Sequence, residues 1–402
     1  MTRGRVLFWG TIAAYCLIGM EIVIMISPFA LYFYSIYGPI LDLLSLSRYT
    51  CWTTEFFLPH MVFPDDSLIL YISYLQVLLV VGLLLFFTAA IPLYYNRFTG
   101  KGVVQISFYK KIRHPQYLFL AISGFGLLLY WPRFIILIMY VTMLFVYYLL
   151  ARNEEWRMQQ EAPQAYARYM ASTPMFLPGE PGGRLFAALF GWVRPKWAGI
   201  LGLYLLTLCL AVFVAMGLRV YTVHTLQRVQ VGEMMLVPVF PRQEAAVRAL
   251  YQQILADPAV RRQFAKRPDI NLGYLMPGDF FLMALVTDAD RRFSDDMIQR
   301  FPEILEWHRY KFRGGLGKFF RIFYNFVSTW GTVPTNYDIE RFVFVAVHDR
   351  SGRAVTPERL FAMGLVRTPA LIVDLDARTH EVLGMVPTSE NNKWGRMPMP
   401  TF

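Results

Sequence analysis

Residues that could do chemistry stand at both ends of one long apolar stretch. Arg113, His114 and Pro115 precede this stretch, and Glu154 and Glu155 follow it. Charged groups at a membrane are costly, so clusters of them are candidate functional sites. Proline suits the first turn of a helix, where its missing N–H would be unpaired anyway. Arg113 and His114 therefore flank a predicted helix N-terminus, where backbone N–H groups and the helix dipole attract an anion such as a carboxylate.

The glutamate pair predicts a complementary role. Two adjacent carboxylates beside Arg113 and Arg152 could hold a pair of ribose hydroxyls and balance a sulfonium charge. His114, Glu154 or Glu155 could serve as a base if an acceptor proton came within hydrogen-bond reach. The alternative is a solvated helix end with ordinary salt bridges, which contribute little to stability. That alternative is favoured for the glutamates alone, but not for the glutamates combined with the Arg-His-Pro sequence.

Small residues lie along the helix predicted to follow Pro115. Gly124 falls on the same face as Tyr117, and Gly126 lies nearby. Small side chains let another backbone or a flat ligand approach closely. For these glycines taken alone, ordinary packing between membrane helices is the favoured explanation.

The composition indicates an integral membrane protein with a soluble part. Of 402 residues, 56% are hydrophobic and only 17% charged, and the mean hydropathy is +0.38. The long apolar runs precede residue 218, whereas the rest has the charge spacing of a globular domain. We therefore predict an α-helical polytopic membrane domain over 1–218 and a soluble α/β domain over 219–402. The net charge of +11 is attributed to membrane topology and not to nucleic-acid binding.

Five membrane segments are predicted, each judged against the roughly 20 apolar residues that a spanning helix needs. Pro28 should kink or divide the first. The third and fourth are short, and Trp131-Pro132-Arg133 joins them into a tight hairpin that need not reach the far surface. Because short connections make antiparallel neighbours, the hairpin should bring the two polar clusters together. The predicted segments are 7–37, 68–95, 116–130, 134–150 and 197–217.

Basic residues in the loops predict the orientation. The segment 97–113 holds five basic residues and no acid, whereas 38–67 holds four acidic residues and one basic residue, Arg48. The positive-inside rule places the first loop in the cytoplasm and the second outside. The N-terminus is then cytoplasmic in a bacterial inner membrane, and the soluble domain is extracytoplasmic, which means periplasmic in a Gram-negative cell.

Two stretches, RHPQYLFLAISGFG and NEEWRMQQEAPQAYARYMASTPMFLP, resemble the isoprenylcysteine carboxyl methyltransferase and phospholipid methyltransferase superfamily. The resemblance covers about residues 110–178. It implies a membrane enzyme that uses S-adenosylmethionine, with Tyr169 and the segment 174–178 closing over the cofactor. The candidate catalytic residues are His114, Glu154 and Glu155. The candidate cofactor-binding residues are Arg113, His114, Tyr117, Gly124, Gly126, Glu154, Glu155 and Tyr166.

The chain departs from the family pattern at three places. Phe119 stands where the family has glycine, and its ring could fill space that the cofactor needs. Ala162-Pro163 replaces a Phe-Gly pair, and Met175 replaces a basic residue. The Gly-Glu pair that follows a similar element in sterol reductases is absent, which argues against a nicotinamide enzyme.

The soluble part resembles the thioredoxin-like fold over about 341–387. Strands are predicted at 341–348, 369–375 and 381–386, with a helix beginning at Thr356-Pro357-Glu358. The resemblance implies a cis peptide bond before Pro369, because such bonds are usually fixed by the fold. A further strand at 280–286 is followed by 287–292, which contains none of the cysteines that thioredoxins carry there. Thiol–disulfide exchange is therefore excluded, and we expect this domain to bind a partner or brace an assembly.

Other features of the chain are weaker. The basic and aromatic segment 311–321 suits a membrane surface or a partner groove, although an ordinary surface loop is favoured. His308, His348 and His380 are isolated, so no metal site is predicted. The cysteines Cys16, Cys51 and Cys209 all fall in the predicted membrane domain, which leaves the soluble domain with none.

Two functions follow from these patterns. The first is an S-adenosylmethionine-dependent methyltransferase that acts on a lipid or lipidated acceptor. The acceptor class follows from a site between membrane helices, where apolar tails can enter laterally. The second is a catalytically inactive structural subunit of an envelope complex. The first is favoured because the anion seat and the carboxylate pair are both retained.

Overall fold

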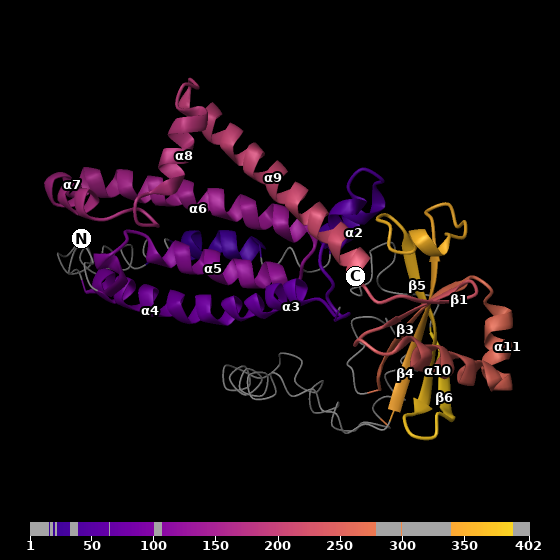
Figure 1. Ribbon diagram of the computed structural model, residues 1–402. Coiled ribbons are helices and arrows are strands. Elements are labelled where there is room, and N and C mark those ends of the chain that lie inside the picture. The colour runs from indigo at the N-terminus through magenta and orange to yellow at the C-terminus, as the bar shows by residue number, and fades with distance from the viewer. Residues whose placement is uncertain are drawn as a thin grey trace, which may run out of the picture. The chain divides into compact units, whose positions relative to one another are not determined.

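The chain forms two compact units in a computed structural model (Figure 1). The model describes residues 16, 19–20, 22–32, 39–63, 65–99, 107–278, 299 and 339–388. The helical unit takes the described residues within 1–44, 56–58 and 67–220. The sheet unit takes those within 45–55, 59–66 and 221–402. The main division after residue 220 lies close to the predicted boundary, but the two short segments 45–55 and 59–66 join the sheet unit and were not anticipated.

Three helices of the described chain are long and apolar enough to cross a membrane. The first runs over Ser67–Asn96 through α3 (Ser67–Tyr74), η2 (Leu75–Val77) and α4 (Leu78–Phe98). The others are α6 (Phe134–Glu161) and α9 (Lys196–Thr225). Two shorter apolar helices, Ile22–Tyr32 and α5 (Pro115–Tyr130), lie where further spans were predicted. Five full-length spans are therefore not observed in the part of the chain that is described.

Two expectations about these helices need correction. The fourth segment was predicted to be short, but α6 has 28 residues, because no helix breaker occurs before Pro163. Helix geometry also continues through Pro28 in Ile22–Tyr32, so this proline does not divide the helix, and the alternative of a kink stays a prediction. The second and fifth predicted segments, 68–95 and 197–217, correspond to the helices Ser67–Asn96 and Lys196–Thr225.

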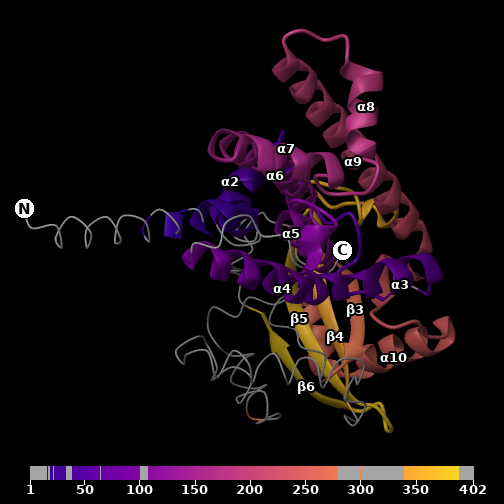
Figure 2. The same ribbon diagram turned by 90° about the vertical axis from the view of Figure 1, so that its left-hand side faces the viewer.

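Close packing fixes α5 against α4, and the two helices run side by side (Figures 1 and 2). A Cβ atom at Gly126 would collide with the backbone of Leu79, and one at Gly82 would collide with the backbone of Ser123. The Ser123 hydroxyl also donates to the Leu79 carbonyl at 2.9 Å. Small residues thus allow a close backbone approach that larger side chains would prevent. The position of α5, whose first turn directly follows Arg113 and His114, is set by this contact.

The remaining helical elements are shorter. α2 (Pro39–Leu46) precedes the 3₁₀ helix η1 (Cys51–Thr54), and η3 (Ser107–Lys110) precedes α5. α7 (Pro163–Ser172) and α8 (Pro181–Phe190) follow α6. α7 begins at Pro163, whose ring suits the first helical position, so the departure at Ala162-Pro163 marks the end of α6.

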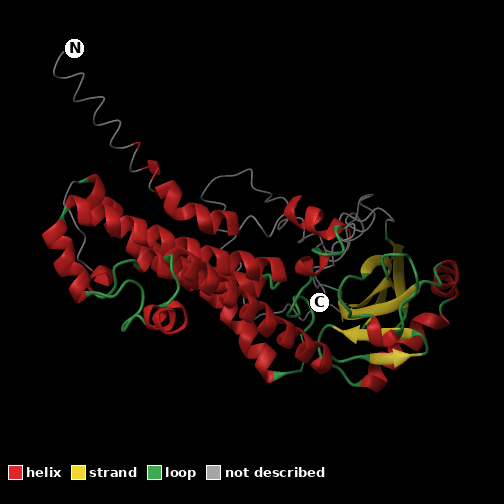
Figure 3. Ribbon diagram, turned by 90° about the horizontal axis from the view of Figure 1, so that it is seen from above, coloured by secondary structure: helices red, strands yellow, loops and turns green. Residues whose placement is uncertain are grey.

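All the named strands, yellow in Figure 3, belong to the sheet unit. They form one sheet in sequence order: β1 (Val229–Val231), β2 (Met234–Pro238), β3 (Ile270–Pro277), β4 (Ile339–His348), β5 (Val366–Asp376) and β6 (Val382–Pro387). β2 and β3 are parallel, as the helical connection through α10 (Glu244–Ala256) and α11 (Pro258–Lys266) requires. The other neighbouring strands are antiparallel. The unit is thus a mixed α/β fold.

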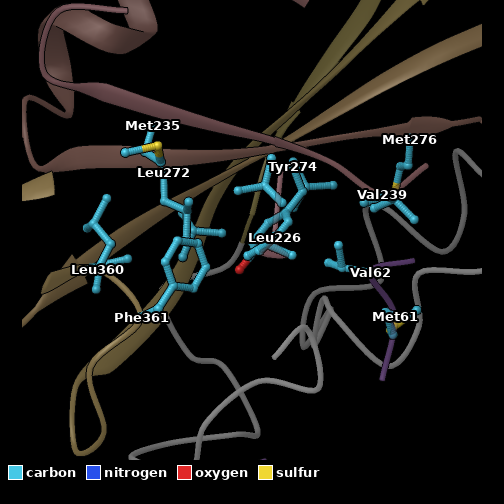
Figure 4. Packing of buried hydrophobic residues seen from close by; sticks show 14 of the residues in the cluster. Met61, Val62, Leu226, Met235, Val239, Leu272, Tyr274, Met276, Leu360 and Phe361 are labelled. Carbon is cyan, nitrogen blue, oxygen red and sulfur yellow. The ribbon is translucent and has the colours of Figure 1, made fainter. Parts of the chain in front are cut away.

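Apolar cores lie on both faces of this sheet. Phe342 and Phe344 of β4 pack on one face with the apolar stripe of α10, which includes Tyr251. Val343 and Val345 alternate to the opposite face, as strand geometry dictates. Met61, Val62 and Leu226 pack into the core on that opposite face, as do Leu360 and Phe361 (Figure 4). The segment 59–66 is therefore a structural part of the sheet unit.

Several predictions for the soluble part are wrong. The cis peptide bond found in the described chain is Arg194–Pro195, not the one before Pro369. Pro369 lies within β5 opposite Val345, where the register shifts, and such an irregularity accommodates a residue that has no N–H. The helix expected at Thr356 is only the 3₁₀ turn Pro357–Arg359. The predicted features at 280–286, 287–292, 311–321 and His308 lie outside the described residues.

The sheet unit also contains one cysteine. Cys51 is buried within it, although the sequence had assigned all three cysteines to the membrane part. Its sulfur approaches the Arg48 carbonyl at 3.5 Å, and the described cysteines are all free thiols.

Candidate functional site

The α5–α6 hairpin brings the two polar clusters together. α5 begins at Pro115, and the connection Trp131–Arg133 returns the chain into α6. The imidazole Nδ1 of His114 lies 3.3 Å from Glu154 Oε2, and its Nε2 lies 3.5 Å from Glu155 Oε1. The predicted proximity of the histidine and the glutamate pair is therefore confirmed.

Arg113 is the most heavily bonded side chain of this cluster. Its Nε donates to Glu155 Oε1 at 2.6 Å, and both side chains are about 95% buried, with exposures of 6% and 5%. Nη1 donates to the carbonyls of Thr173 and Met170, the latter at 3.1 Å. Nη2 lies 3.4 Å from Glu180 Oε1, and that carboxylate is 51% exposed. The guanidinium thus joins α6, the end of α7 and the segment that follows α7.

Tyr117 links the histidine to Glu154. Its hydroxyl donates to Glu154 Oε1, and its ring stacks on Tyr147 with the centroids 4.9 Å apart. The rings of His114 and Tyr117 lie 5.8 Å apart, as expected for residues one helical turn apart. Glu154 retains 31% exposure of its side chain, whereas Glu155 is almost fully buried. Glu154 is therefore the more accessible carboxylate of the pair.

The segment 173–180, which we call the strap, passes over the start of α5. The backbone N–H groups of Arg113 and His114 donate to the carbonyls of Pro174 and Met175 at 3.0 and 3.1 Å. Glu180 Oε1 in turn accepts from the Met175 N–H at 2.9 Å. The two N–H groups that precede α5 are therefore bonded to the strap, and they are not free to bind an anion.

Tyr166 and Tyr169 of α7 support the site from beside the strap. Both are buried, and the Tyr169 hydroxyl donates to the Tyr109 carbonyl at 2.7 Å. Burial raises the pKa of Tyr169 to about 12, although Arg113 opposes this rise. Burial also raises the pKa of Tyr166. Both phenols stay protonated near neutral pH, so neither acts as a base.

His114 is held in an acidic environment. Burial lowers its pKa, but the contacts with Glu154 and Glu155 raise it more, so the net pKa lies above the usual value. A protonated His114 together with Arg113 gives two positive charges beside three carboxylates, from Glu154, Glu155 and Glu180. The protonated imidazole is thus balanced by its two glutamate partners.

Three predicted participants lie elsewhere. A Cβ at Gly124 would press on Met143 and Tyr140, and Gly126 packs on Leu79, so both glycines serve contacts between helices. Arg152 is exposed.

Phe119 does not lie beside His114 in the described structure. Its ring packs edge-to-face on Phe108 at 4.9 Å. Two positions along a helix correspond to a rotation of about 200°, so Phe119 faces away from Tyr117. The rings that flank His114 are instead Tyr117 and, at 6.0 Å, Phe176 of the strap. The concern that Phe119 fills the predicted cofactor space is therefore not supported.

Sequence reasoning missed Glu180 and Tyr147. Glu180 is the one acid between residues 162 and 232 and stands between Gly179 and Pro181, which was a usable signal. The sequence offers no such signal for Tyr147, because an aromatic residue within an apolar run most often serves only packing. In the described residues, no group of three or more His, Cys, Asp or Glu side chains could hold a metal ion.

Comparison with known proteins adds no name to this arrangement: no family model, no curated protein and no solved structure matches the chain.

Proposed function

We propose that this protein is an integral membrane methyltransferase that uses S-adenosylmethionine and acts on a lipid or lipidated acceptor. The observation that carries the proposal is the joining of Arg113 and His114 to Glu154 and Glu155 within 3.5 Å at one end of the hairpin. Nothing in ordinary helix packing requires four ionisable side chains there, and ionisable clusters at a membrane are expensive. The acceptor is inferred from the lipid surroundings of the hairpin.

The residues of the cluster suit this cofactor chemically. S-adenosylmethionine supplies a methyl group on a positively charged sulfur. The carboxylate of Glu154, which is partly exposed, complements such a cation. Glu155 is less accessible, because its Oε1 is bonded to Arg113, so we assign it a positioning role. Arg113, Tyr117 and Tyr166 complete the proposed cofactor-binding set.

The same geometry distinguishes the possible bases. A protonated His114 cannot accept a proton, and its raised pKa keeps it protonated at higher pH than an ordinary histidine. Glu154 is the better candidate base for an amine or hydroxyl acceptor, since its carboxylate is partly exposed. A carboxylate acceptor would need no base. We therefore assign His114 mainly to charge balance and to the orientation of the glutamates.

A structural role remains the second candidate, and one observation favours it. Every nitrogen of the Arg113 guanidinium already contacts an acceptor of the chain itself. Such a saturated network can simply lock the hairpin to α7. This reading would make the protein a structural subunit of a membrane complex.

Calorimetry separates these two functions. Full-length protein in lipid nanodiscs should bind S-adenosylmethionine, and Glu154→Gln should weaken that binding at least tenfold. A labelled methyl group should then appear in the lipid fraction. The absence of binding heat with intact protein would refute the methyltransferase and leave the structural role. A matched control is Glu161→Gln, an exposed glutamate at the end of α6.

We also propose the membrane orientation. The sheet unit contains 45–55 and 59–66 as well as residues after 220, so both ends of 67–220 must lie on one side of the membrane. An even number of crossings is then required between them. The helix Ser67–Asn96, α6 and α9 supply three, so the 16-residue α5 must supply the fourth despite its length of about 24 Å.

Charge assigns the two sides. The stretch 181–196 around α8 holds Arg184, Arg194 and Lys196 without an acid, like the loop before α5. Both therefore belong to the cytoplasmic side, and the sheet unit to the extracytoplasmic side of a bacterial inner membrane. A phosphatase reporter fused at the C-terminus should be active; a reporter active only in the cytoplasm would refute this orientation.

The sheet unit is proposed to bind a partner or brace an assembly. Its mixed sheet and helical crossover support membership of the broad α/β class, and the thioredoxin-like assignment remains the resemblance of 341–387. A lone buried Cys51 in the described residues offers no cysteine pair for disulfide exchange.

A further inference from the structure

Glu180 stands apart from the other carboxylates of the site. Glu155 is held in the interior and Glu154 extends from α6, but Glu180 comes from the strap and is half exposed. Its Oε1 receives two donors, the Met175 N–H at 2.9 Å and Arg113 Nη2 at 3.4 Å. These donors, one a backbone amide and one an almost fully buried guanidinium, converge on a single carboxylate oxygen.

The contact between Arg113 and Glu180 is the weakest that Arg113 makes. The bond to Glu155 is 0.8 Å shorter, from 2.6 against 3.4 Å, and is buried on both sides. The bonds from Nη1 go to backbone carbonyls that belong to α7 and its end. An exposed ion pair is worth little, whereas the buried one is costly to break. Nη2 is therefore the guanidinium nitrogen of Arg113 whose partner can most easily be exchanged.

The backbone of Glu180 favours such an exchange. Its φ of 46° is left-handed, a region that a residue other than glycine enters at a cost, and Gly179 beside it has φ of 77°. Glu180 also directly precedes Pro181, the first residue of α8. The Glu180 carbonyl accepts from the N–H groups of Gly183 and Arg184 at 3.0 and 3.3 Å, so the start of α8 holds the backbone of Glu180 while its side chain can leave Arg113.

We propose that the pair formed by Arg113 Nη2 and the Met175 N–H is a carboxylate subsite, which Glu180 occupies until a ligand carboxylate displaces it. This inference rests on the proposed function, because the amino-acid end of S-adenosylmethionine supplies a carboxylate. Glu180 acts as an internal competitor that keeps the strap closed over His114 when no ligand is bound. When the ligand carboxylate displaces Glu180, the strap is released in the same step in which Arg113 binds the ligand. No covalent step is involved.

Binding measurements test the exchange in full-length protein in nanodiscs. Glu180→Gln keeps the shape of the side chain but removes the competing charge, so affinity for S-adenosylmethionine should rise about threefold. Affinity for 5′-methylthioadenosine, which lacks the carboxylate, should not change. Glu161→Gln should alter neither affinity. An unchanged or weaker affinity of Glu180→Gln for S-adenosylmethionine would overturn the subsite while leaving the methyltransferase in place.

Hydrogen exchange provides a readout that needs no ligand. The amides of Arg113 and His114 bond to the strap, so their exchange should be faster in Glu180→Gln than in the wild-type protein. Equal exchange rates would show that Glu180 does not hold the strap closed, and this would overturn the proposed role of Glu180. Failure of the wild-type protein to bind S-adenosylmethionine would instead refute the proposed function and, with it, the assignment of the ligand.

Discussion

Arg341 of the sheet unit and Arg113 of the helical unit are both buried arginines, but they are held in different ways. Arg341 makes a two-bond pair with Asp374, from Nε at 2.6 Å and Nη2 at 2.7 Å, and Nη1 donates to the Gly278 carbonyl at 3.0 Å. Its partner lies directly opposite on the neighbouring strand. Arg113 instead divides its bonds among α6, α7 and the strap, and its last bond is long and half exposed.

This difference separates a structural ion pair from one that can change partners. The Arg341–Asp374 pair is closed, since a regular strand register fixes both residues and no exposed carboxylate takes part. The Arg113 network is open, because its contact with Glu180 is half exposed. It also contains a histidine whose charge depends on pH. An ion pair with both partners buried stabilises the fold, whereas a network with one exchangeable contact can respond to a ligand.

The largest expected effect concerns the closed pair. Arg341→Met should destabilise the sheet unit by about 3–5 kcal/mol, because it leaves the buried Asp374 carboxylate unpaired. Thermal unfolding of the full-length protein measures this loss. The control is Arg341→Met combined with Asp374→Leu, which removes both charges and should recover most of the stability. If Arg341→Met were as stable as the wild type, the Arg341–Asp374 pair would not be a stabilising structural ion pair.

The glutamates of the open network should differ from each other. Glu155→Gln should lower the free energy of unfolding by about 1.5–3 kcal/mol, since it weakens a charged hydrogen bond to buried Arg113. Glu154→Gln should cost less than about 1 kcal/mol, because Glu154 is partly exposed. Both should weaken binding of S-adenosylmethionine. Equal stability losses would contradict the division into a positioning and a ligand-facing carboxylate.

Much of the helical unit could be predicted from the sequence. The hairpin and the meeting of His114 with the glutamates followed from a short connection, and short connections leave little choice of geometry. The end of α6 was misjudged, because hydropathy ends near Leu150 whereas helix geometry continues through polar residues to Glu161. Hydropathy reports the surroundings of a helix and not its length.

Other features depended on contacts that no local pattern encodes. The segment 59–66 packs on a sheet whose strands begin about 170 residues later in the chain, and apolar residues in a loop do not specify their partner. Pro369 has the sequence context of a cis-proline, yet a register shift in the ladder accommodates it within β5. Glu180 takes its role from the fold of the strap, which brings a downstream residue back to Arg113.

The third prediction concerns the charge of His114. The Arg341–Asp374 pair of the sheet unit contains no histidine, so it offers no comparable change near neutral pH. The pKa of His114 is raised, so the protonated form is stabilised in the folded protein. That stabilisation is complete below about pH 6.5, the ordinary value, and is lost as pH rises through the folded value. The melting temperature should therefore fall as pH rises above about 6.5, by less than Glu155→Gln lowers it.

His114→Gln isolates this contribution, because glutamine cannot titrate. The pH-dependent fall in melting temperature should be smaller in this variant than in the wild-type protein. Glu154 and Glu155 contact the imidazole, and Arg113 is bonded to Glu155, but an ordinary histidine is the group of this set that titrates near neutral pH, so His114 is expected to respond. The same fall in both proteins would assign the pH dependence to another group.

The smallest effect is expected from Phe119, the residue that departs most visibly from the family pattern. Phe119→Leu should change affinity for S-adenosylmethionine by less than about twofold, because the ring packs on Phe108 and faces away from Tyr117. Calorimetry on the same nanodisc preparation measures this affinity, and Tyr117→Phe provides the contrast, since it removes the hydroxyl that donates to Glu154. A marked gain in affinity for Phe119→Leu would mean that the ring does obstruct the ligand. The network around Arg113 would then be left over from a binding site that the ring now obstructs. The two buried arginines would differ in evolutionary origin and not in present function.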